Sequence, residues 1–156
     1  MYDPKYDPVE HLDALKVRLV KHTLHHEYAI WAPERRLVAI DRNTPAHLVR
    51  PVLSHEADHA EKNDVGGHHS KNETRANLNS ALRLINPSEW DLLAATLTDY
   101  DRICLELGIT RAQFRAYHEH RRSIDAARVR LDRIGDALYL NPKMGVGQWA
   151  MRFEVA

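Results

Sequence analysis

Cysteine is almost absent from this chain of 156 residues, where Cys104 is the only one. A lone cysteine excludes an intramolecular disulfide framework and the cysteine-rich zinc modules, and it requires no oxidising compartment. Long apolar runs are absent as well, and residues 1–16 (MYDPKYDPVEHLDALK) contain no apolar signal core. We therefore expect a cytoplasmic protein without a membrane segment.

A net charge is also lacking, because 22 Lys and Arg residues balance 22 Asp and Glu residues. This balance argues against broad electrostatic binding to nucleic acid or to an anionic membrane. Histidine, in contrast, is abundant, with eleven residues. Since histidine is the commonest metal ligand, the positions of these residues matter most for function.

Three short apolar segments near the N-terminus predict strands, at residues 17–20, 28–31 and 37–40. The last two flank residues 32–36, a turn-like segment that contains a proline. We expect the three strands to form a small antiparallel sheet.

Beyond residue 40 the apolar spacing becomes helical. Thr44 followed by Pro45 is typical of an N-cap with proline at the first helical position. Pro51 leaves two interpretations open: it kinks this helix, or the main helix starts there and carries residues 52–62. Further helices are predicted at 72–85, at 88–107 with Ser88 as N-cap, at 110–121 and at 123–139.

The C-terminal end changes pattern again, because Trp149, Met151, Phe153 and Val155 alternate as in a half-buried strand. The fold class is therefore α+β and dominated by helices. Its small antiparallel sheet lies near the N-terminus, and a short strand forms the tail.

The sequence HExxH is formed by His55, Glu56 and His59. Residues i and i+4 of a helix share a face, so both imidazoles can bind one ion. Glu56 follows the first ligand and is directed beside the ion, where it can act on water as a general base. This pattern predicts one catalytic Zn²⁺ per chain. The plain alternative is a helix with solvated histidines.

A catalytic zinc needs a third protein ligand, and the downstream candidates are Glu73, His68 and His69. Glu73 is favoured because it opens a predicted helix on which Asn77 lies one turn later, where its amide can hydrogen-bond a ligand imidazole. A histidine six residues after the second ligand, as in metzincins, is excluded because that residue is Val65.

Two segments together resemble the ImmA/IrrE-type metallopeptidases, in the compact form carried by phages and mobile elements. VLSHEADHA at 52–60 takes the place of the family's HExxH helix. ETRANLNSALRLI at 73–85 fits the family's pattern E-x-x-A-[ND]-x-x-[AS]-A-x-x-L-I. With the predicted strands that precede them, the resemblance covers residues 1–120.

The resemblance implies a zincin-like core whose zinc ligands are His55, His59 and Glu73, with Glu56 as the catalytic base. Relatives cleave a helix-turn-helix repressor in bacterial or phage-infected cells, which releases genes for prophage excision, element transfer or a damage response. We therefore expect a metallopeptidase-like domain over residues 1–120. Residues 121–156 form a C-terminal extension that the resemblance does not reach.

Two residues depart from peptidase HExxH helices, since Asp58 and Glu61 are charged where uncharged or apolar residues are usual. We expect that part of the helix to be unusually solvated. The donor that stabilises negative charge during hydrolysis is left open among His68, His69 and Tyr100.

A rival hypothesis comes from residues 103–117 (ICLELGITRAQFRAY), which resemble a helix-turn-helix with Gly108 at the turn and Thr110 as N-cap. Arginines follow on the second helix, so the segment could bind DNA or recognise a repressor, with a vestigial or structural metal site elsewhere. Such corners are also common in purely structural roles. Neutral net charge favours a protein partner over nucleic acid.

Two remaining features have simpler interpretations. The apolar stripe over residues 124–138 is a packing surface or the seam of a homodimer through 123–139. Cys104 shares an apolar helix face with Leu107, which favours a buried, inert thiol over a nucleophile.

Overall fold

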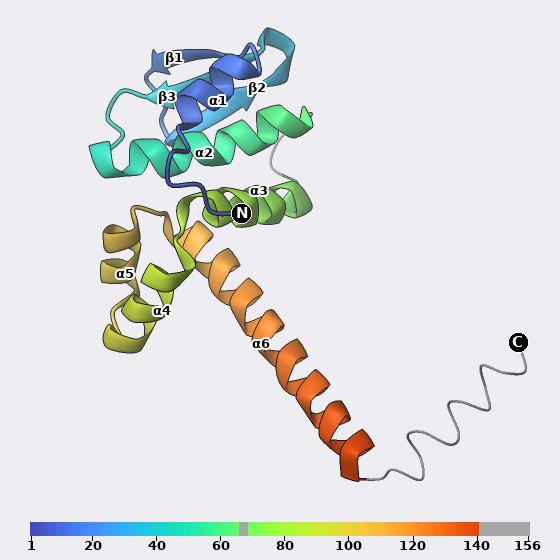
Figure 1. Ribbon diagram of the computed structural model, residues 1–156. Coiled ribbons are helices and arrows are strands. Elements are labelled where there is room, and N and C mark those ends of the chain that lie inside the picture. The colour runs from blue at the N-terminus through green and yellow to red at the C-terminus, as the bar shows by residue number, and fades with distance from the viewer. Residues whose placement is uncertain (66–68, 141–156) are drawn as a thin grey trace, which may run out of the picture. The chain divides into compact units, whose positions relative to one another are not determined.

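A computed structural model describes residues 1–65 and 69–140 of the chain, with side chains as far as residue 133 (Figure 1). The fold is α+β, as predicted. The elements in chain order are α1 (Pro8–Ala14), β1 (Arg18–His22), β2 (Ala29–Ala32), the 3-10 helix η1 (Pro33–Arg35), β3 (Leu37–Asp41), α2 (Ala46–Lys62), α3 (Ser70–Leu84), α4 (Pro87–Thr96), α5 (Tyr100–Leu107) and α6 (Arg111–Leu140).

The sheet has the order β1-β3-β2 and is mixed. β2 and β3 pair antiparallel through the predicted turn, whereas β1 pairs with β3 in parallel, so the expectation of a wholly antiparallel sheet was wrong for that pair. The physical reason lies in β3, whose Val38 and Ile40 are 0% and 4% exposed. This most buried strand takes the centre, and β1 therefore lies beside β3 instead of its chain neighbour β2.

Sheet and helices are stacked in order, with α2 between the sheet and α3 (Figure 1). One face of α2 contributes Leu53, Ala57 and Ala60 to a core shared with α1 and the sheet. A second core joins α3, α4, α5 and the start of α6, and Trp90 packs there on Phe114. α2 and α3 are also joined directly, because Asp58 of α2 accepts hydrogen bonds from Arg75 and Asn79 of α3.

α2 is one continuous helix with Pro51 inside it, which settles the question that the sequence left open. Its N-cap is Pro45, and the Thr44 hydroxyl donates to the Tyr28 carbonyl oxygen at 3.3 Å, so the predicted Thr44 cap was wrong. Pro51 lacks the N–H that would bond the carbonyl of residue 47, and the helix continues across that single missing bond.

Several boundaries among the later helices differ from the prediction. α4 is capped by the Asn86 side chain, which accepts from the Ser88 N–H, so Ser88 is not the cap. The expected helix 88–107 is two helices, because the Asp99 carboxylate caps a new one by accepting from the N–H groups of residues 101 and 102. The expected break near residue 122 is missing, and the Ser123 hydroxyl instead donates to the His120 carbonyl within α6.

The chain divides into two compact units, Met1–His118 and Glu119–Ala156. In the second unit the described side chains of the apolar stripe are exposed, with Ile124 at 47% and Leu131 at 68%. The predicted tail strand lies outside the described residues. None of the helices within residues 1–65 and 69–140 combines the length and the apolar character needed to cross a lipid bilayer.

Candidate metal centre

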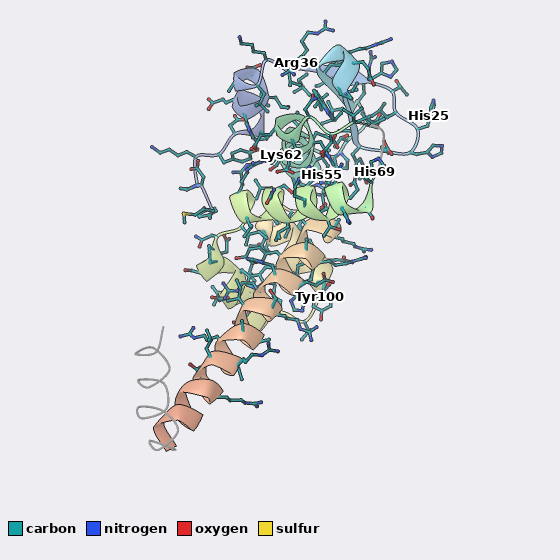
Figure 2. All side chains as sticks on the ribbon, turned by 90° about the vertical axis from the view of Figure 1, so that its right-hand side faces the viewer. His25, Arg36, His55, Lys62, His69 and Tyr100 are labelled. Atoms are coloured by element: carbon teal, nitrogen blue, oxygen red, sulfur yellow. The ribbon has the colours of Figure 1, made fainter. Side chains whose placement is uncertain are left out.

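Helix α2 presents the HExxH residues on the side that meets α3. His55 is partly exposed, whereas Glu56 and His59 are 8% and 7% exposed. Figure 2 shows His55 where α2 passes over α3, and His69 at the N-terminal end of α3. The i, i+4 spacing therefore places both imidazoles at a helix-helix junction, where a second helix can add a ligand.

Helix α3 offers a candidate third ligand in its first turn. Glu73 lies four residues after the N-cap His69, and its backbone N–H donates to the His69 carbonyl at 3.0 Å. The free N–H groups at a helix N-terminus stabilise a carboxylate in this position. Among the described residues, His55, His59 and Glu73 are the group whose donor atoms lie close enough to share a metal ion.

The candidate donor atoms lie close enough together to share one metal ion. The Nε2 atoms of His55 and His59 are 3.0 Å apart, Glu73 Oε2 lies 3.2 Å from His55 Nε2, and the other carboxylate oxygen, Oε1, lies 3.4 Å from His59 Nε2. Zinc–nitrogen bonds of about 2.0–2.1 Å in tetrahedral geometry place neighbouring donors about 3.3 Å apart. Two imidazoles and one carboxylate at this spacing fit a zinc ion.

The candidate ligand His59 is held by Asp64, whose Oδ2 lies 2.7 Å from the imidazole Nδ1. An Nδ1–H that donates to this carboxylate leaves the lone pair on Nε2, directed at the ion. Asn63 makes the contact feasible, because its left-handed backbone (φ 50°) ends α2 and turns the chain back. The Asp64 N–H then bonds the His59 carbonyl at 3.0 Å, and the Trp31 indole N–H bonds the Asp64 carbonyl at 3.1 Å.

Asp58 extends this network into the interior. Its side chain is 0% exposed and accepts from Arg75 Nε and Asn79 Nδ2, both at 2.9 Å. The same guanidinium also donates to Asp64. The expected solvation of this part of the helix was therefore wrong for Asp58: α3 neutralises its charge, whereas Glu61 is exposed and bound by Arg83 at 2.6 Å.

The electrostatics suit metal binding. Burial, and then the neighbouring His59, lower the pKa of His55, which keeps its imidazole in the neutral form that binds metal. Burial raises the pKa of the Asp64 carboxyl, but hydrogen bonds from Arg75 and His59 outweigh this and leave the pKa below its usual value. Asp64 is therefore an anion that faces the ligand imidazole.

A pocket of about 770 Å³ opens onto the site and is lined by His55, Glu56, Glu73 and Asn77. Its other walls come from the start of β2, from the N-terminal half of α2, and from the α5–α6 corner, by which we mean residues 100–118. The sequence did not indicate that Glu27, Tyr28 and His47 line the pocket, because nothing in the pattern around them marks them as site residues. Sequence reasoning also missed Asp64, for which the signal was a carboxylate directly after Asn63, a residue that tolerates left-handed backbone.

Other candidate residues from the sequence are placed as follows. Asn77 lines the pocket, but the described partner of the ligand imidazole is Asp64, so the role of Asn77 stays a prediction. His69 is exposed, and His68 lies outside the described residues. Tyr100 is 62% exposed, lies tilted against Phe114 with 5.1 Å between ring centres, and is not among the described residues that line the pocket.

Residues 103–117 form the end of one helix, a turn and the start of the next, in the predicted order. Gly108 is left-handed (φ 61°) and ends α5, and Thr110 and Gln113 cap α6 reciprocally, with N–H···O contacts of 2.9 and 3.2 Å. Cys104 is buried as expected, at 7% exposed. The corner carries part of the pocket wall, so it lies beside the metal site.

Comparisons with known proteins give no match, either in a scan of protein-family models or in searches of curated proteins and of solved structures.

Proposed function

We propose that this chain is a zinc-dependent metallopeptidase that cleaves a protein substrate. The observation that carries the proposal is the cluster of His55, His59 and Glu73, in which contacts of 3.0–3.4 Å bring two imidazoles and one carboxylate together at the wall of an open pocket. A catalytic zinc site needs three protein ligands and one position accessible to water and substrate. The three side chains support the first requirement, and the open pocket beside them supports the second.

The roles follow from the positions of the side chains. Zinc, when bound, polarises the scissile carbonyl and makes water more acidic. Glu56 lines the same pocket and adjoins the ligand His55 along the helix, so it can accept the proton of the attacking water and return it to the leaving amine. Asp64 holds His59 in place throughout. No described contact selects the group that stabilises negative charge during hydrolysis.

The proposed substrate is a helix-turn-helix repressor. The support is the likeness of residues 52–60 and 73–85 to the ImmA/IrrE-type peptidases, whose relatives cleave such repressors. A repressor encoded by a neighbouring gene is the first protein to test, because related peptidases are commonly encoded beside their targets.

The burial and the contacts of the α5–α6 corner argue against the DNA-binding alternative. Gln113, Phe114 and Tyr117 are at most 7% exposed, so much of the second helix faces the protein core. Arg111 at its start is bound by Asp101 in two contacts of 2.6 Å. These contacts favour a packing role for the corner.

The test compares Glu56→Gln with the wild type. Both proteins are loaded with zinc, measured by elemental analysis, and incubated with the neighbouring repressor or with unfolded casein. We expect one zinc per chain in both proteins and cleavage by the wild type alone. Wild-type protein that retains no zinc after desalting would contradict the proposal, and so would cleavage that persists in Glu56→Gln. His25→Ala, at an exposed histidine, is the control for substitution itself.

A further inference from the structure

The pocket at the metal centre continues into an apolar compartment. Two of its walls contribute six small or apolar side chains: Leu48 and Val52 from α2, and Cys104, Leu105, Ile109 and Ala112 from the α5–α6 corner. This compartment belongs to the same pocket as Glu56 and the ligands, so a peptide bound at the metal reaches it directly.

The spacing along α2 gives its distance from the reaction centre. Val52 and Leu48 precede Glu56 by four and eight residues, so the three lie in one row on the helix. At 1.5 Å per residue, they are about 6 and about 12 Å from Glu56 along the helix axis. An extended peptide rises about 3.3 Å per residue, so a side chain two to four positions from the scissile bond falls within the compartment.

The wall formed by the α5–α6 corner is firmly anchored. Gln113 is 0% exposed, and its Nε2 donates to the Pro51 carbonyl of α2 and to the Ser80 hydroxyl of α3, both at 2.8 Å. The corner is thereby bound to both helices that carry the metal ligands. A wall fixed in this way exists before substrate binds, which favours selection by shape.

The charges at the corner are compensated. Asp101 and Arg111 line the pocket and bind each other through two contacts of 2.6 Å. A charged substrate side chain would therefore lose hydration among Leu48, Val52 and Leu105 without gaining an available counterion at the corner. An apolar side chain gains by leaving water.

From this arrangement we propose that the α5–α6 corner forms the specificity subsite of the peptidase and accepts a large apolar side chain, such as leucine, methionine or phenylalanine, close to the scissile bond. The inference rests on the proposed function. It gives the helix-turn-helix segment a role in substrate selection.

The experiment measures binding, so that it does not depend on turnover. The probes are three blocked tetrapeptide hydroxamates that differ only in the side chain three positions from the hydroxamate, which is leucine, alanine or aspartate, and calorimetry measures their affinity for protein of known zinc content. We expect the leucine probe to bind at least about 10-fold more tightly than the alanine probe, the scale of discrimination in apolar pockets. Aspartate should bind most weakly.

Two variants then locate the preference. Leu105→Glu places a charge in the wall, and Ala112→Trp fills the compartment; both positions are exposed enough to tolerate the change in the fold. Each should reduce the preference for leucine to less than about 3-fold, within the loss expected from a changed apolar contact. Leu92→Glu is the matched control, because Leu92 is 63% exposed against 59% for Leu105 and lies outside the pocket wall.

The outcomes separate the two proposals. Zinc-loaded protein that binds the three probes equally, or a leucine preference unchanged in both variants, overturns the subsite and leaves the metallopeptidase in place. Protein that holds no zinc overturns the proposed function, and the subsite with it.

Discussion

Asp64 Oδ2 lies 2.7 Å from His59 Nδ1, and this contact joins a loop residue to a proposed metal ligand five positions earlier in the chain. The carboxylate fixes the imidazole so that Nε2 faces His55 and Glu73. Arg75 on α3 donates to the same carboxylate, so the helix that carries the proposed third ligand, Glu73, also supports the proposed second one, His59. Helix α3 therefore carries Glu73 and also, through Arg75 and Asp64, helps to orient the His59 imidazole.

We predict that Asp64→Asn weakens zinc binding by about 10- to 100-fold, the range found when a partner of a ligand histidine is removed. The amide is nearly isosteric, but it loses the negative charge that favours donation from Nδ1. Competition with a chromogenic chelator measures the affinity. Asp13→Asn, at an exposed aspartate, should bind zinc as the wild type does. Equal affinity in Asp64→Asn and the wild type would show that the contact does not tune the site.

Replacement of Glu73 should identify the third ligand. Glu73→Ala removes the one carboxylate of the proposed ligand set, so we expect zinc to be lost on desalting, whereas His69→Ala should retain about one ion per chain. Elemental analysis after gel filtration gives the stoichiometry. The reverse result, with zinc lost in His69→Ala alone, would move the third ligand to the loop before α3.

Removal of Asp58 should destabilise the fold. In Asp58→Ala, Asn79 loses its acceptor and Arg75 keeps only Asp64 and Asn72 as acceptors. Breaking a fully buried pair costs about 3–5 kcal/mol; since the Arg75 side chain is 30% exposed, we expect about 2–3 kcal/mol in the free energy of unfolding. Urea denaturation measures it. Glu61→Ala, which breaks an exposed pair, should cost less than about 1 kcal/mol, and equal losses in both variants would contradict the burial argument.

The Cys104 thiol should react slowly in the folded protein. Burial, and secondarily the Asp101 carboxylate, raise the pKa of this thiol, so the reactive thiolate is scarce at neutral pH. We expect iodoacetamide at pH 7.5 to modify native protein at least about 10-fold more slowly than protein unfolded in urea, with the native rate rising as the pH increases. Mass spectrometry follows the modification. Equal rates in the two states would mean that the thiol is accessible and has an ordinary pKa.

The sequence alone determined the features that depend on local spacing. His55 and His59 share a face because four residues make about one helical turn, and Glu73 lies near the start of the next helix. The α+β class and the turn at Gly108 follow from periodicity and from local backbone preference in the same way. One local signal was overlooked, since Asp7 and Pro8 form an N-cap and first turn that begin α1.

Tertiary structure decided everything that required two distant segments to meet. The parallel pairing of β1 with β3 depends on which strand buries the most surface, and the burial of Asp58 depends on an arginine 17 residues away on another helix. The approach of the α5–α6 corner to the pocket depends on Gln113, which bonds Pro51 62 positions earlier. Periodicity reports which face of an element is apolar, whereas the partner of that face is chosen by packing and by the neutralisation of buried charge.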